Sequence, residues 1–264
     1  MEIDLYQIDA FADRVFAGNP AAVCPLQAWL PDPLLQSIAQ ENNLSETAFI
    51  VPEGDQYHIR WFTPVSEVDL CGHATLAAAY ALFEILDIGK ETLSFTSKSG
   101  VLTVTRGRNM LSMDFPSQPP SICMPPPALI EAFSSHPQEY LCAEDYIVVF
   151  EHEHEVLSAI PDLELLKKLG RRGVIITAGS DKYDFVARFF APKYGINEDP
   201  VTGSAYTQLV PYWADKTTNS QFHVRQLSVR GGDLHCELLK DRVVIAGQCI
   251  LYLQGKITIA VDAM

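Results

Sequence analysis

The feature that most constrains the fold is a pattern that occurs twice, in the same order, in the two halves of the chain. The segment Arg60–Pro64 reads RWFTP, and Arg188–Pro192 reads RFFAP. In each half a glycine then precedes an apolar segment of helical length, first at Gly72 and again at Gly203. A repeat this long indicates two paired domains rather than a solenoid of short units.

The segment at residues 73–86, HATLAAAYALFEIL, is almost continuously apolar and rich in alanine. Such a helix has no polar stripe to face water, so we expect it to be buried on all sides. Residues 45–64 form two β-rich runs around Gly54, a pattern typical of a hairpin. We therefore predict an α+β protein with two pseudo-symmetric domains. Each would be a curved, mostly antiparallel, barrel-like sheet wrapped around a central apolar helix.

A proline-rich stretch separates the two copies of the pattern, with six prolines between residues 116 and 127. Proline has no backbone N–H to donate to a sheet, so this stretch is typical of a linker. We predict an N-terminal domain at 1–116, a linker at 117–128 and a C-terminal domain at 129–264. An alternative assigns the last residues of the chain to the N-terminal domain.

The composition argues against several partners. The 264 residues include 33 Asp and Glu against 19 Lys and Arg, a formal charge of −14, which a nucleic-acid backbone would repel. The apolar stretch near 75–86 is too short to span a bilayer and contains Glu84. The N-terminus lacks the pattern of an export signal, and the six cysteines show no CxxC spacing. We expect a cytoplasmic enzyme with reduced thiols that binds neither membrane nor nucleic acid.

The two glycines at the helix starts point to an anion site. A helix N-terminus presents unpaired N–H groups and the positive end of the helix dipole. Gly72 and Gly203 would let a ligand approach that backbone closely. If the halves face each other, both N-termini open onto one cleft and bind a carboxylate or stabilise an enolate-like charge. Each glycine alone is read more readily as a tight turn, but the matched pair favours the anion site.

Three titratable residues lie close in sequence to these helix starts: Glu46, His73 and Asp199. A lone residue of this kind is usually structural, whereas three around duplicated helix starts are better candidates for acid–base chemistry. His152 and His154 in the EHEHE segment could share a metal ion, but nothing nearby completes a ligand set. A solvated acidic edge is favoured there, and we predict no metal site.

Four segments together resemble a known family. They are FAGNPAAV at 16–23, SETAF at 45–49, DLCGHAT at 69–75 and EDPVTGSA at 198–205. In this order they are similar to the phenazine-biosynthesis isomerase (PhzF-like) family, and the resemblance covers nearly the whole chain. That family's fold resembles diaminopimelate epimerase, with two pseudo-symmetric halves, each built around a central helix.

The resemblance also implies a site. Glu46 would carry the proton, with His73 and Asp199 lining the same site. The residues that would hold the substrate are Cys71, Gly72, Gly203 and Ser204. The resemblance implies no metal and no organic cofactor. It implies a small carboxylate-bearing metabolite as the substrate and a homodimer as the assembly.

One position separates subclasses on this scaffold. The epimerases use two thiols, one at each helix start, whereas this chain has Cys71 at the first position and Thr202 at the second. A threonine hydroxyl is too weakly acidic to replace a thiolate, so a two-thiol racemisation is disfavoured. The resemblance implies instead a cofactor-independent isomerase that shifts a proton by general acid–base catalysis. Two alternatives stay open: an epimerase or racemase with Glu46 or Cys71 as one base, and a catalytically idle binding protein. The sequence does not name the substrate, and phenazine synthesis is one option among several.

Overall fold

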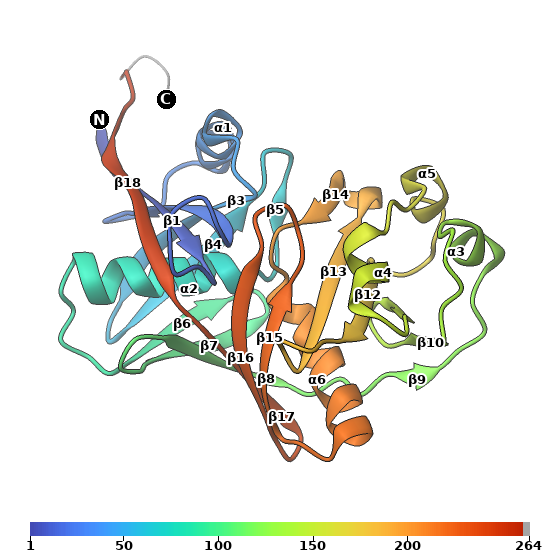
Figure 1. Ribbon diagram of the computed structural model, residues 1–264. Coiled ribbons are helices and arrows are strands. Elements are labelled where there is room, and N and C mark those ends of the chain that lie inside the picture. Colours follow the sequence, from blue (N-terminus) through green and yellow to red (C-terminus); the bar gives the residue numbers. More distant parts are fainter. Residues whose placement is uncertain (261–264) are drawn as a thin grey trace. The chain divides into compact units, whose positions relative to one another are not determined.

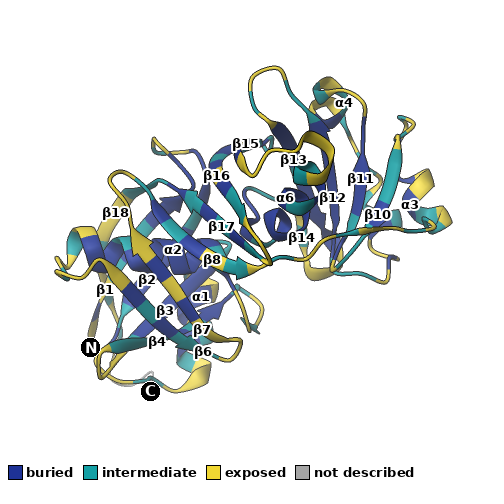
Figure 2. Ribbon diagram, turned by 90° about the horizontal axis from the view of Figure 1, so that it is seen from below, coloured by how far each residue is buried: buried dark blue, intermediate teal, exposed yellow. Residues whose placement is uncertain are grey.

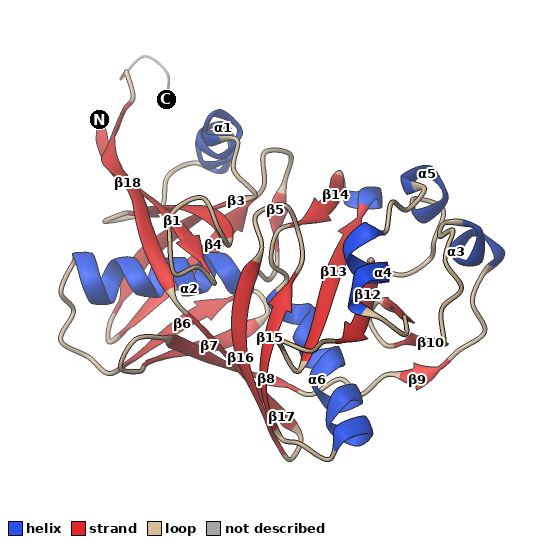
Figure 3. Cartoon of the chain, in the orientation of Figure 1, coloured by secondary structure: helices blue, strands red, loops and turns tan. Residues whose placement is uncertain are grey.

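The computed structural model describes residues 1–260, and the chain divides into two compact units. Unit 1 comprises Met1–Asp114 together with the C-terminal residues from Ala246, and unit 2 comprises Phe115–Ile245. Figure 1 labels their elements and Figure 3 separates helices from strands. The proline-rich residues 117–128 fall at the start of unit 2. Within residues 1–260, no helix is long and apolar enough to cross a membrane.

Unit 1 is a sheet with helices on its faces. Its strands are β1 Glu2–Ala10, β2 Asn19–Pro25, β3 Glu46–Glu53, β4 Gln56–Phe62, β5 Glu67–Val68, β6 Thr92–Ser97, β7 Gly100–Arg106, β8 Leu111–Pro116 and β18 Cys249–Thr258. Its helices are α1 Asp32–Asn42, α2 Gly72–Tyr80 and the π-helix η1 Ala81–Ile85, which continues α2. Strands β18, β1, β2, β3, β4, β6 and β7 pair in that order.

Unit 2 is built in the same way. Its strands are β9 Ser121–Ile122, β10 Glu139–Cys142, β11 Tyr146–Val149, β12 Val174–Gly179, β13 Phe185–Ala191, β14 Ile196–Asp199, β15 Gln221–Gln226, β16 Gly232–Leu239 and β17 Arg242–Gly247. Its helices are α3 Pro127–Glu131, α4 Glu153–Ser158, α5 Leu163–Leu166, the 3₁₀ turn η2 Pro192–Tyr194 and α6 Gly203–Thr217. Strands β9, β10, β11, β12, β13, β15 and β16 pair in that order.

The duplication in the sequence is also a duplication of topology. In unit 1 the pairs β2–β3 and β4–β6 are parallel and the other pairs along the series are antiparallel. The corresponding pairs in unit 2, β11–β12 and β13–β15, are likewise the parallel ones. The repeated arginines also match: Arg60 holds Glu67 of β5 at 2.8 and 3.0 Å, and Arg188 holds Glu198 of β14 at 2.7 and 3.0 Å. The predicted α+β fold is confirmed.

The core of unit 1 surrounds α2, as the apolar pattern predicts. Every residue from His73 to Ala79 is buried, and the helix contacts β1, β2, β3, β7 and β18. Figure 2 shows α2 as a buried helix. The opposite face of the sheet is covered by α1, whose Leu35 and Ile38 join Phe49 and Phe62 in a second apolar cluster.

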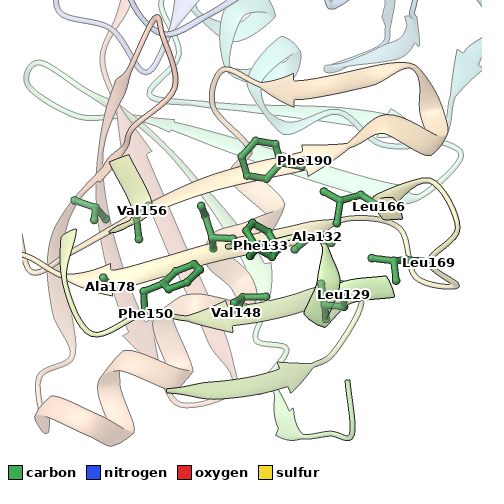
Figure 4. Close-up of a cluster of buried hydrophobic side chains, with 13 residues drawn as sticks. Leu129, Ala132, Phe133, Val148, Phe150, Val156, Leu166, Leu169, Ala178 and Phe190 are labelled. Atoms are coloured by element: carbon green, nitrogen blue, oxygen red, sulfur yellow. The ribbon is translucent and has the colours of Figure 1, made fainter. Parts of the chain in front are cut away.

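Unit 2 repeats this arrangement around α6. Trp213 of α6 stacks on Phe185 of β13 with ring centroids 5.4 Å apart, and its Nε1 donates to Thr177 Oγ1 of β12 at 3.1 Å. Helices α3, α4 and α5 contribute to an apolar cluster with β11, β12 and β13, shown in Figure 4. Each unit therefore positions the N-terminus of one central helix within its own sheet.

Candidate active site

Glu46 is the first residue of β3, where the strand pairs in parallel with Ala21 of β2. The next residues, Thr47 to Ile50, are also buried, so the pairing of the strand carries a carboxylate into the interior. Glu46 is only 8% exposed. A carboxylate this deeply buried needs compensating charge or hydrogen bonds to offset its lost hydration.

His73 supplies that compensation from the start of α2. Its Nε2 lies 3.1 Å from Oε2 of Glu46, and both side chains are buried. Its Nδ1 lies 3.3 Å from Nδ2 of Asn19, whose Oδ1 accepts a hydrogen bond from Ser45 Oγ at 3.1 Å. His73 Nδ1 also lies 3.5 Å from Sγ of Cys71. The ring is therefore held between Asn19 and Cys71 on one side and Glu46 on the other.

The contact between Glu46 and His73 leaves one atom of each side chain without a hydrogen bond among the described residues. Within the described part of the chain, Glu46 Oε2 and His73 Nε2 are buried and have no hydrogen-bond partner, although they lie 3.1 Å apart. They are close enough to attract as charges, but they are not aligned as donor and acceptor. Buried polar atoms of this kind are uncommon in folded proteins and point to a ligand or a catalytic role.

The surroundings of His73 change how its ring titrates. Burial disfavours the imidazolium, but Cys71 and the Glu46 carboxylate favour it, and the net effect raises the pKa of His73 well above its usual value. Burial, followed by the nearby Glu46 charge, raises the pKa of Cys71 to about 11. Cys71 therefore stays a neutral thiol near pH 7, which makes it a weak base and nucleophile.

The same three side chains offer a set of metal ligands. Glu46, Cys71 and His73 each place one ligand atom within 4.8 Å of the others. Oxygen, sulfur and nitrogen are all donors that zinc accepts, although a zinc–sulfur bond needs the thiolate. The pKa of about 11 at Cys71 opposes that ionisation. The absence of a resident metal stays a prediction.

Both central helices begin without side-chain capping. Cys71 is the N-cap of α2 and Thr202 is the N-cap of α6, and neither of these described helices has a side-chain hydrogen bond at its cap. Gly72 and Gly203 are the first helical residues in their units. Uncapped N–H groups at a helix start are ready to bind an anion.

In unit 2, Asp199 is held against the start of α6. Thr202 Oγ1 donates to Asp199 Oδ2 at 2.5 Å. Gln226 joins the two residues, because its Nε2 donates to the Asp199 carbonyl at 2.8 Å and its Oε1 accepts from the Thr202 N–H at 2.9 Å. The Thr202 hydroxyl is thus engaged in holding a carboxylate.

Sequence reasoning missed a second buried charge centre in unit 2. Arg172 binds the fully buried Asp145 at 2.5 and 3.0 Å and donates to Ser204 Oγ at 2.9 Å. Gln208 of α6 donates to the same carboxylate at 2.7 Å. The available signal was a pair of arginines, Arg171 and Arg172, in an acidic chain. Asn19 was missed too, although it lies within the quoted FAGNPAAV segment.

The structure therefore collects the sequence-predicted residues in two groups. Glu46, Cys71 and His73 lie together in unit 1 at the start of α2. Asp199, Gly203 and Ser204 lie at or beside the start of α6 in unit 2. That both helix starts open onto one cleft stays a prediction.

Two units of equal topology, each with a central helix without a side-chain cap, define a duplicated α+β protein, and unit 1 holds a buried carboxylate–imidazole pair of the kind that acid–base catalysis uses. The chain belongs to the phenazine biosynthesis-like protein family, whose model matches residues 8–255. It is 50% identical to an uncharacterized isomerase of Pseudomonas aeruginosa over 97% of this chain and 98% of that protein. At the level of the family, the enzyme class is isomerase.

Solved structures agree with this assignment. A PhzF-family protein from Enterococcus faecalis has a TM-score of 0.96 at 46% identity, covering 98% of this chain and all of that one. A hydroxyproline epimerase from Agrobacterium vitis has a TM-score of 0.65 at 9% identity, covering 97% of this chain and 92% of that chain. At that identity the second likeness concerns the fold alone.

Proposed function

We propose that this protein moves a proton between two carbon atoms of one small carboxylate-bearing substrate, with Glu46 as the proton carrier. The observation that carries this proposal is the buried contact of Glu46 with His73, in which Oε2 and Nε2 lie 3.1 Å apart and neither has a hydrogen-bond partner among the described residues. A carboxylate placed in this way has an acceptor oxygen available for a proton from carbon.

In the proposed reaction Glu46 first accepts a proton from a carbon next to the substrate's carboxylate. The electron pair of the broken C–H bond moves into the substrate and forms an enolate-like intermediate. Glu46 then returns the same proton to another carbon, so no other reactant is consumed. His73, with its raised pKa, places positive charge beside Glu46 during the transfer.

The start of α2 supplies the binding group in this proposal. The N–H groups of Gly72 and His73 lie at the positive end of a helix with no side-chain cap among the described residues. They would bind the substrate carboxylate and stabilise charge that develops on it during proton removal. The formal charge of −14 does not oppose this, because local N–H groups decide the binding of a small anion.

Two observations favour one carboxylate base over a pair of thiols. Cys71 has its pKa raised to about 11, so little thiolate exists near pH 7. At the equivalent helix start, the Thr202 hydroxyl is engaged with Asp199. A two-thiol inversion at carbon therefore lacks its second thiol, at Thr202, and a ready thiolate at Cys71, whereas Glu46 is available in either step.

A deuterium wash-in screen tests the proposal. The protein is incubated in heavy water with a panel of cyclic and acyclic carboxylates, and the products are analysed by mass spectrometry and NMR. The proposal expects a double-bond or positional isomer of at least one carboxylate. Part of this product should carry the substrate's own proton at the new carbon instead of deuterium from the solvent. Inversion at one carbon would show an epimerase instead, and tight binding with no isomerisation or exchange would show a binding protein.

A further inference from the structure

A second pair of reactive side chains lies at the edge of unit 2, apart from the residues described above. Strand β9 pairs with β10 so that Ser121 lies opposite Cys142 and Ile122 lies opposite Leu141. The Cys123 N–H continues this ladder by donating to the Tyr140 carbonyl at 3.1 Å. Because side chains alternate along a strand, Cys123 lies on the same face as Ser121, and therefore on the face of Cys142. Figure 1 shows the two strands side by side.

One guanidinium contacts the sulfur of Cys142. Arg171 Nη2 donates to Cys142 Sγ at 3.2 Å, and its Nη1 donates to the Ala143 carbonyl. The guanidinium also lies 5.4 Å from the centre of the Tyr146 ring, which holds it in place. A hydrogen bond from a cation stabilises negative charge on sulfur, and the thiolate is the reactive form of cysteine. Cys142 is half-buried, so small molecules can reach it.

Cys123 is suited to the second step. Burial, followed by the neighbouring Cys142, raises the pKa of Cys123 to about 11, so it stays protonated while Cys142 reacts. The buried cysteines differ from Cys123 in their exposure. Cys24, for example, is fully enclosed, and burial raises its pKa to about 12. Cys123 is half-buried beside a neighbouring sulfur.

We propose that Cys123 and Cys142 form a dithiol that reacts with hydrogen peroxide and closes into a reversible disulfide. The Cys142 sulfur attacks one peroxide oxygen, the O–O bond breaks, and Cys142 becomes a sulfenic acid, while the departing hydroxide takes up the proton of the Cys142 thiol and leaves as the first water. The Cys123 sulfur then displaces the sulfenic hydroxyl, which leaves as the second water with the thiol proton of Cys123. The two sulfurs lose two electrons and two protons, and the peroxide is reduced to two waters.

The strand geometry permits closure with a small movement. Diagonal neighbours on one face of an antiparallel pair lie roughly 7–8 Å apart, whereas a disulfide needs its Cα atoms within about 7 Å. A small shift of strand β9, whose two residues are both exposed, brings the adjoining Cys123 within that limit. The closed disulfide would fasten the proline-rich segment to β10.

Hydrogen peroxide added to the reduced protein tests this proposal. We expect two of the six thiols to be lost, one peptide linkage between Cys123 and Cys142 in the mass spectrum, and full recovery with dithiothreitol. Cys123→Ser should stop at a sulfenic acid on Cys142 that dimedone traps. Arg171→Gln should slow the reaction on the order of tenfold, because a charged hydrogen bond is removed. Cys236→Ser, a buried site, should react like the unaltered protein.

Other outcomes would overturn the proposal. Linkage through any other cysteine, loss of buried thiols as fast as Cys142, or no linkage at all would each do so. Even if Arg171→Gln folds poorly, the peptide linkage in the unaltered protein decides the question.

Discussion

His73 Nε2 lies 3.1 Å from Glu46 Oε2 in unit 1, and the residue that corresponds to His73 in unit 2 is Ser204. Ser204 accepts a hydrogen bond from Arg172 instead of facing a glutamate. The duplicated helix starts therefore share a backbone arrangement but differ in chemistry. One combines an uncapped helix with a titratable pair, and the other combines an uncapped helix with an arginine and Asp199.

The ion pair at the site makes stability depend on pH. The folded pKa of His73 lies well above its usual value of 6.5. A group whose pKa is raised on folding stabilises the protein fully below its unfolded pKa, and this contribution is lost as pH rises through the folded value. The wild type should therefore lose its stability advantage over His73→Gln as pH increases.

Urea unfolding of both proteins between about pH 6 and pH 10 measures this difference. An NMR titration of the His73 ring should also show a lower pKa in Glu46→Gln than in the wild type. An advantage that grows with pH, or a ring that titrates at the same pH in both proteins, would contradict the assigned pair.

The repeated arginines should each stabilise their own unit. Arg60 and the partly buried Glu67 form a two-point contact, and Arg188 and Glu198 form its counterpart. Because solvent weakens these partly exposed pairs, we expect Arg60→Met and Arg188→Met each to lower the free energy of unfolding by about 1 kcal/mol. Substitution to Lys should lower the free energy of unfolding by less, because lysine keeps the positive charge but cannot form the two-point contact with the carboxylate.

The Arg60 pair should also respond to acid. The pKa of Glu67 is lowered to about 2, chiefly by the hydrogen bond that Arg60 donates to its carboxylate. A group with a lowered folded pKa stabilises the protein above its unfolded value, here 4.5, and that stabilisation is lost as pH falls toward 2. The destabilisation caused by Glu67→Gln should therefore shrink in acid, as urea unfolding at two pH values would show. A penalty independent of pH would refute this assignment.

Arg172→Met should be among the most damaging substitutions in unit 2. It leaves Asp145, whose side chain is fully buried, without its cation. Removing one partner of a buried ion pair typically costs about 3–5 kcal/mol of unfolding free energy. Adding Asp145→Asn to the same protein should recover part of that loss, because the uncompensated charge is gone. Chemical denaturation of the single and double variants gives the answer, and a single-variant loss below about 1 kcal/mol would contradict the role of Arg172.

Much of the fold could be predicted because its signals are local. The apolar segment at 73–86 becomes α2 and η1, and the hairpin pattern at 45–64 becomes β3 and β4. The helix N-termini were also predictable, since a glycine before an apolar run marks each start. His152 is exposed in the acidic segment that sequence reasoning read as a solvated edge, and it forms the N-cap of α4 with Glu155.

The partners of the site were not predictable, because they meet across long sequence separations. Asn19 contacts His73 across 54 residues, and Arg172 contacts Asp145 across 27. No periodicity links such positions, and only the strand register brings them together. The resemblance to the PhzF-like family points to Glu46, His73 and Asp199, which stay predictions as site residues. It did not point to the amides that contact two of them, Asn19 at His73 and Gln226 at Asp199. It did not point to Arg172, which contacts Asp145 and Ser204.

The most direct test of the account is proton exchange by Glu46→Gln. The substitution keeps the shape of the side chain and removes its ability to carry a proton. Glu53→Gln is the matched control, because Glu53 ends the same strand β3 and is exposed. The probe is the carboxylate that the wild type isomerises fastest in heavy water. The account predicts that Glu46→Gln still binds this probe and loses exchange by about a hundredfold or more, whereas Glu53→Gln exchanges normally. Exchange by Glu46→Gln at the wild-type rate would contradict it.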